Sequence, residues 1–223
     1  MRLVNSVLDF DIVLEEGNPF VLIIENKRVF SQVVNQLWKE VGGETGDWVL
    51  SNCEKSLSLS KNVDIVFNPY SVNPNDRKVL AKLYSELSDI VSEKYRTIFE
   101  KANGNAVELL SLVTQDAPYF LRYDLEVDMT SILKMFNVQI DSDGDSLLEK
   151  LIDYIRAYNN ICRISIFVFV NLKDYLEIDE LEQLYEFAQY EKANLLLIEG
   201  RQSEILKQEN TLIYDKDMCI ITI

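Results

Sequence analysis

The sequence predicts a mixed α/β protein in which both ends of the chain build one sheet-containing body and the middle builds a helical arm. Apolar runs of strand length occur in the first and last thirds of the chain. Between them, apolar residues recur at helical spacing and no strand pattern intervenes. Near the C-terminus a strand, a helix and a strand follow one another with short joints, which is typical of a parallel crossover unit.

In the first third, Phe20–Ile24 is a continuous apolar run, which is typical of a strand buried on both faces. The turn signal Gly17-Asn18-Pro19 precedes it. Apolar residues then recur at helical spacing from Val29 to Val41, and Gly42-Gly43 predicts the end of that helix. A second strand is predicted at Val63–Phe67.

The middle of the chain predicts helices alone. Asn73-Pro74-Asn75-Asp76 combines a capping residue, a proline suited to the first helical position and an acid suited to the positive helix end, so a long helix is predicted to begin there. A second long helix follows, and Asn103-Gly104-Asn105 is expected to kink or break it. Shorter helices are predicted at Met129–Phe136 and Leu147–Tyr158.

The last third returns to alternating strands and helices. Ile164–Val170 predicts a strand, Asp179–Tyr190 an amphipathic helix and Asn194–Ile198 another strand. Thr211–Tyr214 and Met218–Ile223 are predicted to close the sheet.

Composition excludes several classes of protein. The 223 residues include no histidine and three cysteines, which excludes Ser-His-Asp and Cys-His catalysis, zinc sites with histidine ligands and a four-cysteine zinc site. No apolar run approaches the roughly 20 residues that span a bilayer, and no secretory signal is visible, so a cytoplasmic protein without a membrane partner is expected. The net charge of −15 does not exclude DNA binding, because binding depends on the local field.

The joint between the first buried strand and its helix lacks the residues that bind phosphate. It reads Glu25-Asn26-Lys27-Arg28 and contains no glycine, whereas a phosphate-binding loop requires glycines and a lysine. Glu25 and Lys27 are also a Glu-x-Lys pair, which is half of a common nuclease metal site, and Asp11 could supply the second carboxylate that such a site needs. A solvated strand end is the simpler interpretation, and the nuclease is kept as an alternative.

Two acidic stretches are candidate cation sites. Asp141-Ser142-Asp143-Gly144-Asp145 is similar to a calcium loop, but its glycine and Glu149 come too early for the EF-hand pattern. A turn followed by a capping box, with Asp145 or Ser146 as the cap, explains the same residues. The second candidate set consists of alternating carboxylates and one upstream acid, which are either cation ligands or a solvated face. Its members are Asp116, Asp124, Glu126 and Asp128.

Basic residues are scarce but gathered in two places. One group follows the first buried strand and the other lies on the two long helices, where acids interleave with it. A single chain therefore offers only a thin basic patch. The candidate DNA-binding residues are Lys27, Arg28, Lys78, Lys82, Lys94, Arg96 and Lys101.

The order of several segments resembles the DNA-end-binding adaptation protein of type II-A CRISPR systems. The resemblance runs over nearly the whole chain and is strongest in the C-terminal third. Its segments are Val7-Leu8-Asp9, Phe20–Glu25, Arg28–Ser31, Asn68–Asn73, Val79–Leu83, Asp145–Lys150, Ile166–Asn171, Asp179-Glu180-Leu181, Leu195–Arg201 and Tyr214–Asp217.

The resemblance implies an α/β head related to P-loop NTPase folds but without the phosphate-binding loop, formed by residues 1–71 and 163–223, and an α-helical leg, residues 72–162. It implies a non-catalytic homotetrameric ring that threads double-stranded DNA ends through a lysine-lined hole, supported by calcium ions. The implied role is spacer acquisition in antiviral defence, beside the CRISPR integrase and the RNA-guided effector nuclease.

The sequence departs from the family pattern in two segments. The dense acidic run expected before Leu125–Ile132 is thinned to Asp116–Asp124, which places calcium binding in question. The helix start Thr-Lys-Asp-Glu is replaced by Glu177–Glu180. The alternatives to the ring are the metal-dependent nuclease and an acidic protein-interaction module that does not bind DNA.

Overall fold

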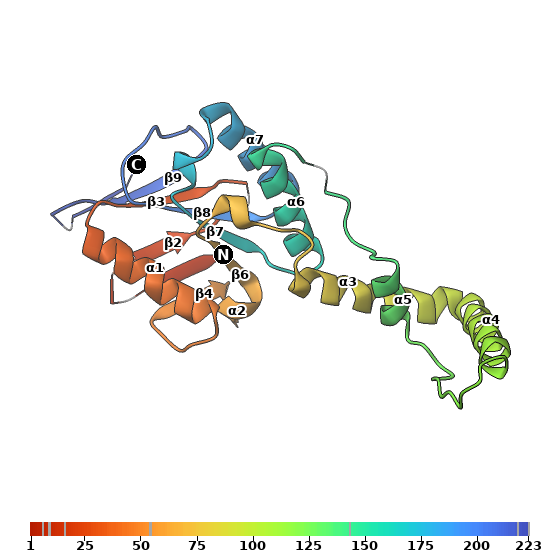
Figure 1. Cartoon of the computed structure of the whole chain (residues 1–223). Helices are drawn as coiled ribbons and strands as arrows, with labels where there is room; N and C mark the ends of the chain where they lie inside the picture. Colours follow the sequence, from red (N-terminus) through yellow and green to blue (C-terminus); the bar gives the residue numbers. More distant parts are fainter. Residues whose placement is uncertain are drawn as a thin grey trace. The chain divides into compact units, whose positions relative to one another are not determined.

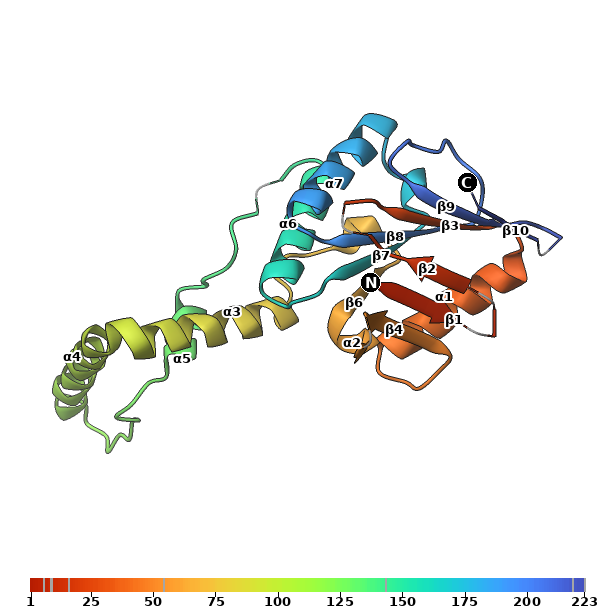
Figure 2. The same ribbon diagram turned by 180° about the vertical axis from the view of Figure 1, so that it is seen from behind.

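A computed structural model of the whole chain describes residues 1–223 except 6, 9, 16, 54, 143, 218 and 223. Contacts divide the chain into two compact units (Figures 1 and 2). The first unit consists of Met1–Pro74 and Ser142–Ile223, and the second of Asn75–Asp141. The predicted α/β class with a helical insertion is confirmed.

A six-stranded sheet forms the centre of the first unit. All its neighbouring strands are parallel except the pair of β10 and β9, which is antiparallel. Its strands, in spatial order, are β10 (Ile220–Thr222), β9 (Asn210–Tyr214), β3 (Phe20–Ile24), β8 (Asn194–Glu199), β7 (Ile166–Val170) and β6 (Val63–Val66). The predicted strands are confirmed, with bounds that differ by up to two residues; residues 218 and 223 lie outside the described part.

Both faces of this sheet are covered, which explains the continuous apolar runs. On one face, Leu22, Val168 and Leu196 share a core with helix α1 (Lys27–Val41). On the other face, Phe167 packs edge-on against Tyr154 of helix α6 (Leu147–Asn160). Helix α7 (Ile178–Tyr190) contacts α6 and β8. It is the predicted crossover helix and lies between β7 and β8 in the chain.

A second, four-stranded antiparallel sheet packs into the core beneath α1 and was not located from the sequence. Leu3, Ile12 and Leu50 of this sheet share the core with α1. Buried residues alternate with more exposed ones along β1, β2 and the start of β4, whereas β5 has no buried residue. Each strand is only three to five residues long, so the period is weak in the sequence. In spatial order they are β2 (Phe10–Val13), β1 (Arg2–Asn5), β4 (Trp48–Asn52) and β5 (Lys55–Leu57).

The second unit contains three α-helices and a π-helical turn. Helix α3 (Arg77–Ile90) contacts helix α5 (Met129–Met135), and helix α4 (Arg96–Gln115) follows α3 after the π-helical turn Val91–Tyr95. The Tyr84 hydroxyl donates to the carbonyl of Val138 at 2.7 Å, and the Asn75 side chain exchanges hydrogen bonds with the backbone of Ile140. These contacts hold α3 against the segment after α5.

Two helix boundaries differ from the predictions. The cap of α3 is Asp76, which accepts a hydrogen bond from the backbone N–H of Val79, so Asn73-Pro74 lies before the helix. The expected break at residues 103–105 was wrong, since α4 is continuous there. The break occurs at the π-helical turn, where the chain departs from α-helical hydrogen bonding.

The start of α6 is a capping box. Ser146 accepts from the backbone N–H of Glu149, and the Glu149 side chain accepts from the backbone N–H of Ser146. The cap interpretation is confirmed; Asp143 of the alternative calcium loop lies outside the described residues. Helix α6 contacts α7 and η1 (Pro69–Ser71), all in the first unit, whereas the sequence assigned it to the leg.

No helix in the described part of the chain has the length and hydropathy that a bilayer crossing requires. Short helical segments complete the first unit. They are α2 (Leu59–Asn62) and η3 (Leu172–Asp174).

Candidate nucleic-acid interface

The candidate DNA-binding side chains lie in both units and all are exposed. Lys27 and Arg28 occupy the first turn of α1 in the first unit. The other five lie in the second unit, on α3, the π-helical turn and the first half of α4. Between residues 77 and 101 there are six basic and four acidic residues, against 22 and 37 in the whole chain. This stretch is therefore positive in a chain that is otherwise strongly acidic.

Arg96 forms an exposed ion pair with an acid of its own helix. Its Nε donates to Glu100 Oε1 at 2.8 Å, one helical turn away, and this hydrogen bond raises the pKa of the guanidinium. Both side chains are exposed, so the pair contributes little to stability. Arg96 can therefore exchange this carboxylate for a phosphate.

The N-terminus of α1 is closed to phosphate by its own cap. The Asn26 side-chain oxygen accepts from the backbone N–H groups of Arg28 and Val29, at 3.1 and 3.4 Å. These are the groups that a phosphate-binding loop would present to a nucleotide. This geometry agrees with the absence of glycines from the strand–helix joint, since both argue against a phosphate-binding loop. The joint instead caps α1 through Asn26.

The four acidic residues suggested for a cation are not gathered into a site. Among the described residues, no group of three or more acidic or cysteine side chains is placed to hold a metal ion. Asp128 caps α5, accepting from the backbone N–H and the hydroxyl of Ser131 at 2.9 and 2.7 Å, and this hydrogen bonding lowers its pKa. Asp116 ends α4. Calcium binding by these carboxylates stays a prediction.

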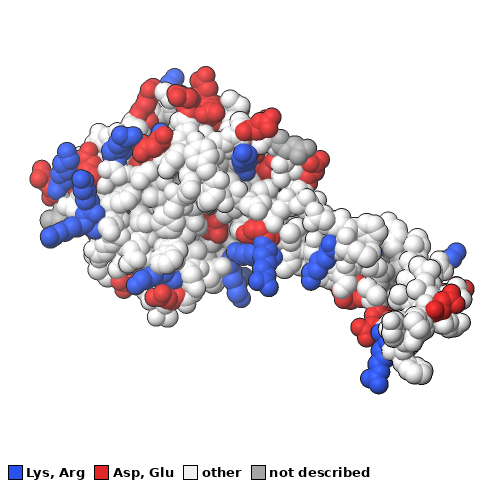
Figure 3. Space-filling model, viewed as in Figure 1, with Lys and Arg blue, Asp and Glu red and all other residues white. Residues whose placement is uncertain are grey.

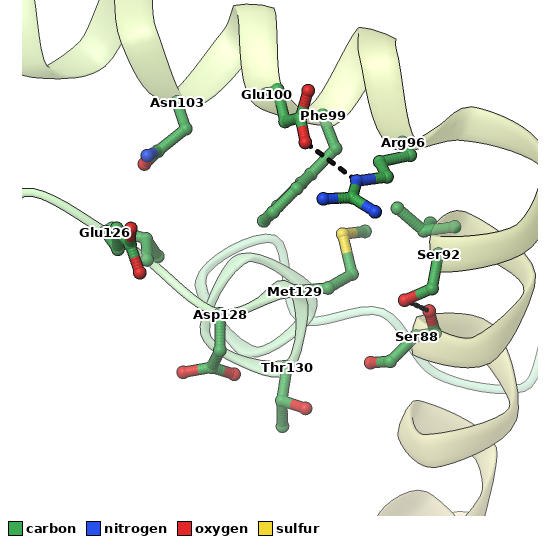
Figure 4. A pocket seen from close by; sticks show the side chains of 12 residues that line it. Ser88, Ser92, Arg96, Phe99, Glu100, Asn103, Glu126, Asp128, Met129 and Thr130 are labelled. Carbon is green, nitrogen blue, oxygen red and sulfur yellow. Dashed lines mark hydrogen bonds and ion pairs between the residues drawn. The ribbon is translucent and has the colours of Figure 1, made fainter.

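A pocket of about 540 Å³ lies where α4, the π-helical turn and the start of α5 meet in the second unit. Figure 4 shows the Phe99 ring and the Met129 side chain directed toward it, with Arg96 at one side. The Asn103 side chain donates to the carbonyl of Leu125 at 3.1 Å and fixes the far side. The sequence did not predict this pocket because its lining comes from two stretches, 88–103 and 126–130, that only folding brings together.

Comparison with known proteins decides the family. The family described as CRISPR-associated protein (Cas_Csn2) matches residues 41–218. The chain belongs to the Csn2 family of CRISPR-associated proteins. A protein named CRISPR-associated protein Csn2 from Streptococcus agalactiae is 26% identical over 217 residues, covering 96% of this chain and 95% of its own. Another from Enterococcus faecalis is 22% identical over 226 residues, covering 97% and 100%. The resemblance stated from the sequence is confirmed.

Solved structures give a more distant likeness. An ATP-binding cassette of an ABC transporter in its ADP conformation has a TM-score of 0.46 at 13% identity, with 94% of this chain and 85% of that chain covered. A second ATP-binding cassette has a TM-score of 0.36 at 11% identity, with 87% and 79% covered. Likenesses at this level do not bear on what the Csn2-family chain binds.

The residues of the alternative nuclease site have other partners or other positions in this Csn2-family chain. Asp11 lies on β2, and its two carboxylate oxygens accept from Nε and Nη2 of Arg2 on β1, at 2.7 and 2.5 Å. That ion pair lowers the pKa of Asp11. Glu25 and Lys27 follow β3 of the other sheet. A metal-binding role for Asp11 would require the Arg2 pair to break.

The carboxyl edge of the large sheet contains a buried polar network that the sequence did not reveal. The Lys173 ammonium donates to Glu209 at 2.8 Å and to the carbonyl of Glu204 at 2.8 Å. Tyr185 donates its hydroxyl proton to the same Glu209 carboxylate at 2.8 Å. The backbone N–H of Lys173 donates to Glu199 at 3.3 Å. These contacts fasten the β8–β9 connection to η3 and α7.

Burial gives this network an expected pH dependence. Glu199 is 2% exposed, and burial raises the pKa of its carboxyl group to about 7. The folded protein then holds a proton that the unfolded chain releases near pH 4.5. The contribution of Glu199 to the free energy of unfolding is therefore full below pH 4.5 and is lost as the pH rises to about 7.

We expect Glu199→Gln to remove this dependence. In urea unfolding at pH 5, 6 and 7, the free energy of unfolding of the variant should rise relative to that of the wild type by up to about 1 kcal/mol per pH unit. Glu182→Gln, an exposed site on α7, is the matched control. Parallel pH profiles for wild type and Glu199→Gln would contradict the assignment.

Proposed function

We propose that this Csn2-family protein is a non-catalytic, sequence-independent binder of double-stranded DNA ends that acts in CRISPR spacer acquisition as a homotetrameric ring. The proposal places it beside the CRISPR integrase and the RNA-guided effector nuclease in the cytoplasm. The observation that carries it is the positive stretch from Arg77 to Lys101 in an otherwise acidic chain of this family.

The distribution of charge between the two units supports a role for the leg. The second unit has eight basic and eleven acidic residues, while the first has fourteen and twenty-six. The second unit thus has a net charge of −3 against −12 for the first, and six of its eleven acids follow Lys101. Four copies of such a stretch around one axis would form a positive collar, because phosphate binding follows the local field and not the net charge.

Helix α4 supports self-association. None of its twenty residues is buried in the monomer. Ile98, Leu109 and Val113 are 68%, 62% and 58% exposed and recur at helical spacing, so they share one face. An uncovered apolar stripe of this kind on a soluble protein is typical of an interface.

We expect Leu109→Glu with Val113→Glu to lower the native mass. The two side chains are exposed in the monomer, so the substitutions leave its core intact and place carboxylates in an apolar contact. Light scattering after size exclusion should show a tetramer for the wild type and a smaller species for the variant. Tyr190→Glu, 83% exposed on α7, is the control. A wild-type monomer at working concentration would exclude the ring.

Threading predicts a dependence on DNA topology. The protein should shift linear duplex in a low-salt gel and leave closed circular duplex of the same sequence unbound, because a closed circle offers no end. If each subunit contacts a phosphate or two, the salt slope should be on the order of −4 to −7. Equal binding to both topologies would defeat the threading hypothesis, and no shift at any salt would favour the acidic interaction module.

The absence of catalysis is tested in the same samples. Incubation of linear duplex with magnesium or manganese should leave it intact, whereas the alternative nuclease requires cleavage. Calcium at Asp116, Asp124, Glu126 and Asp128 stays a prediction from the family resemblance. Equilibrium dialysis against calcium, with and without DNA, tests it.

A further inference from the structure

A shallow aromatic hollow lies along one side of α1, between this helix and the residue that follows β6. Phe30, Val34 and Trp38 are four residues apart and form one row along the helix. Phe67, which follows β6, completes the wall of a hollow of about 280 Å³. Trp38 is 53% exposed and Phe67 44% exposed, so both aromatic side chains are partly accessible to solvent. The other lining residues are uncharged: Ser31 and Asn35.

The charges beside the hollow are all of one sign on this helix. Lys27, Arg28 and Lys39 are exposed, and no ion pair joins them to another described residue. The single acid of α1, Glu40, is 6% exposed and accepts from the backbone N–H of Asp47 at 2.9 Å. Figure 3 faces this helix and shows an uncharged expanse in the middle of the first unit, with charged side chains around it.

The spacing of rings and cations suits one strand of nucleic acid. Arg28 and Lys39 lie about 16 Å apart along the helix axis and share one side of α1, next to the side on which Trp38 lies. Single-stranded DNA combines an anionic backbone with planar bases that stack on aromatic side chains. An apolar protein surface would account for the rings alone, and an acidic peptide for the cations alone.

We propose that this hollow binds unpaired nucleotides at the end of a DNA duplex, with bases stacked on Trp38 and Phe67 and phosphates beside Arg28 and Lys39. The inference rests on the proposed function and deepens it, since it names the form of DNA end that the head of the protein holds. A blunt end has no bases free to enter the hollow, so a tailed end gains contacts that a blunt end lacks.

Tryptophan fluorescence tests the stacking directly. The chain has two tryptophans, and Trp48 is 4% exposed, so quenching by DNA reports on Trp38. A duplex with single-stranded oligothymidylate tails should quench the emission, and the blunt duplex of the same length should not. Trp38→Phe should abolish the quenching while keeping a ring that can stack.

Affinity gives a second readout. Trp38→Ala should weaken binding of the tailed duplex about five- to 100-fold and leave the blunt duplex unchanged. Tyr190→Ala, which removes an exposed ring outside the hollow, is the matched control. Lys39→Glu should also weaken binding of the tailed duplex, since it places a carboxylate beside the phosphates.

The outcomes separate this inference from the proposed function. Equal affinity for tailed and blunt duplex, or equal effects of Trp38→Ala and Tyr190→Ala, would overturn the inference and leave duplex-end binding intact. A loss of native mass in Trp38→Ala would assign the hollow to a second copy of the chain and overturn it too. Binding of tailed duplex without binding of blunt duplex would overturn the blunt-end function and support the hollow.

Discussion

Replacing Glu209 by alanine is expected to lower the free energy of unfolding by about 3–5 kcal/mol, measured by urea denaturation. The side chains of Lys173 and Glu209 are 3% and 0% exposed, so the variant leaves an ammonium ion buried without its carboxylate. The Tyr185 hydroxyl and the backbone N–H of Leu206 lose the same acceptor. One substitution thus removes a charge partner and two hydrogen bonds from the interior.

Two further variants identify the cause. Lys173→Met combined with Glu209→Gln should recover at least half of the loss, because no charge is then buried. The amide oxygen can still accept from the backbone N–H of Leu206, and the amide NH2 group can donate to the Tyr185 hydroxyl oxygen. Asp174→Ala breaks the Arg201–Asp174 pair, whose side chains are 73% and 39% exposed, and should cost less than about 1 kcal/mol. A similar cost for Asp174→Ala and Glu209→Ala would contradict the role of burial.

The double variant Lys78→Glu with Lys82→Glu is expected to weaken duplex-end binding at least about 100-fold at low salt. The two residues are four apart on α3 and lie on one exposed face, so both reversals alter the same surface. In the proposed tetrameric ring the change would be repeated four times around the hole. The salt slope should become shallower by roughly four if each subunit loses one phosphate contact.

A matched control separates position from net charge. Lys55→Glu with Lys61→Glu makes the same change in charge at exposed sites of the first unit, outside the candidate set. It should change affinity by less than about threefold at 0.1 M salt, where screening over about 10 Å confines charges to local effects. Unchanged affinity in the Lys78/Lys82 variant would move the binding surface away from α3.

The large sheet could be predicted because its strands are buried on both faces. Phe20–Ile24 and Ile166–Val170 are continuous apolar runs flanked by helices of clear 3.6-residue period, and each is a strand in the structure. The small sheet escaped prediction because its short strands, such as Arg2–Asn5, share one buried face with α1. That core exists only when segments distant in sequence come together.

The candidate interface could be predicted only as a set of charges. Charge at Lys94 or Lys101 is visible in the sequence, but the absence of any buried residue on α4 is not, since burial depends on what packs against a helix. The aromatic row of α1 could likewise be predicted only in part. Its spacing predicts a helix face, while its exposure beside Phe67 depends on where β6 ends.

The sequence by itself determined the α/β class, the helical insertion, the missing phosphate-binding loop and the family, because these depend on local periodicity, residue identity and segment order. The tertiary structure decided which unit contains α6, which lysine is buried against Glu209, and which faces of α1 and α4 remain uncovered. The physical reason is that burial and pairing depend on residues far apart in the chain, which only folding brings into contact.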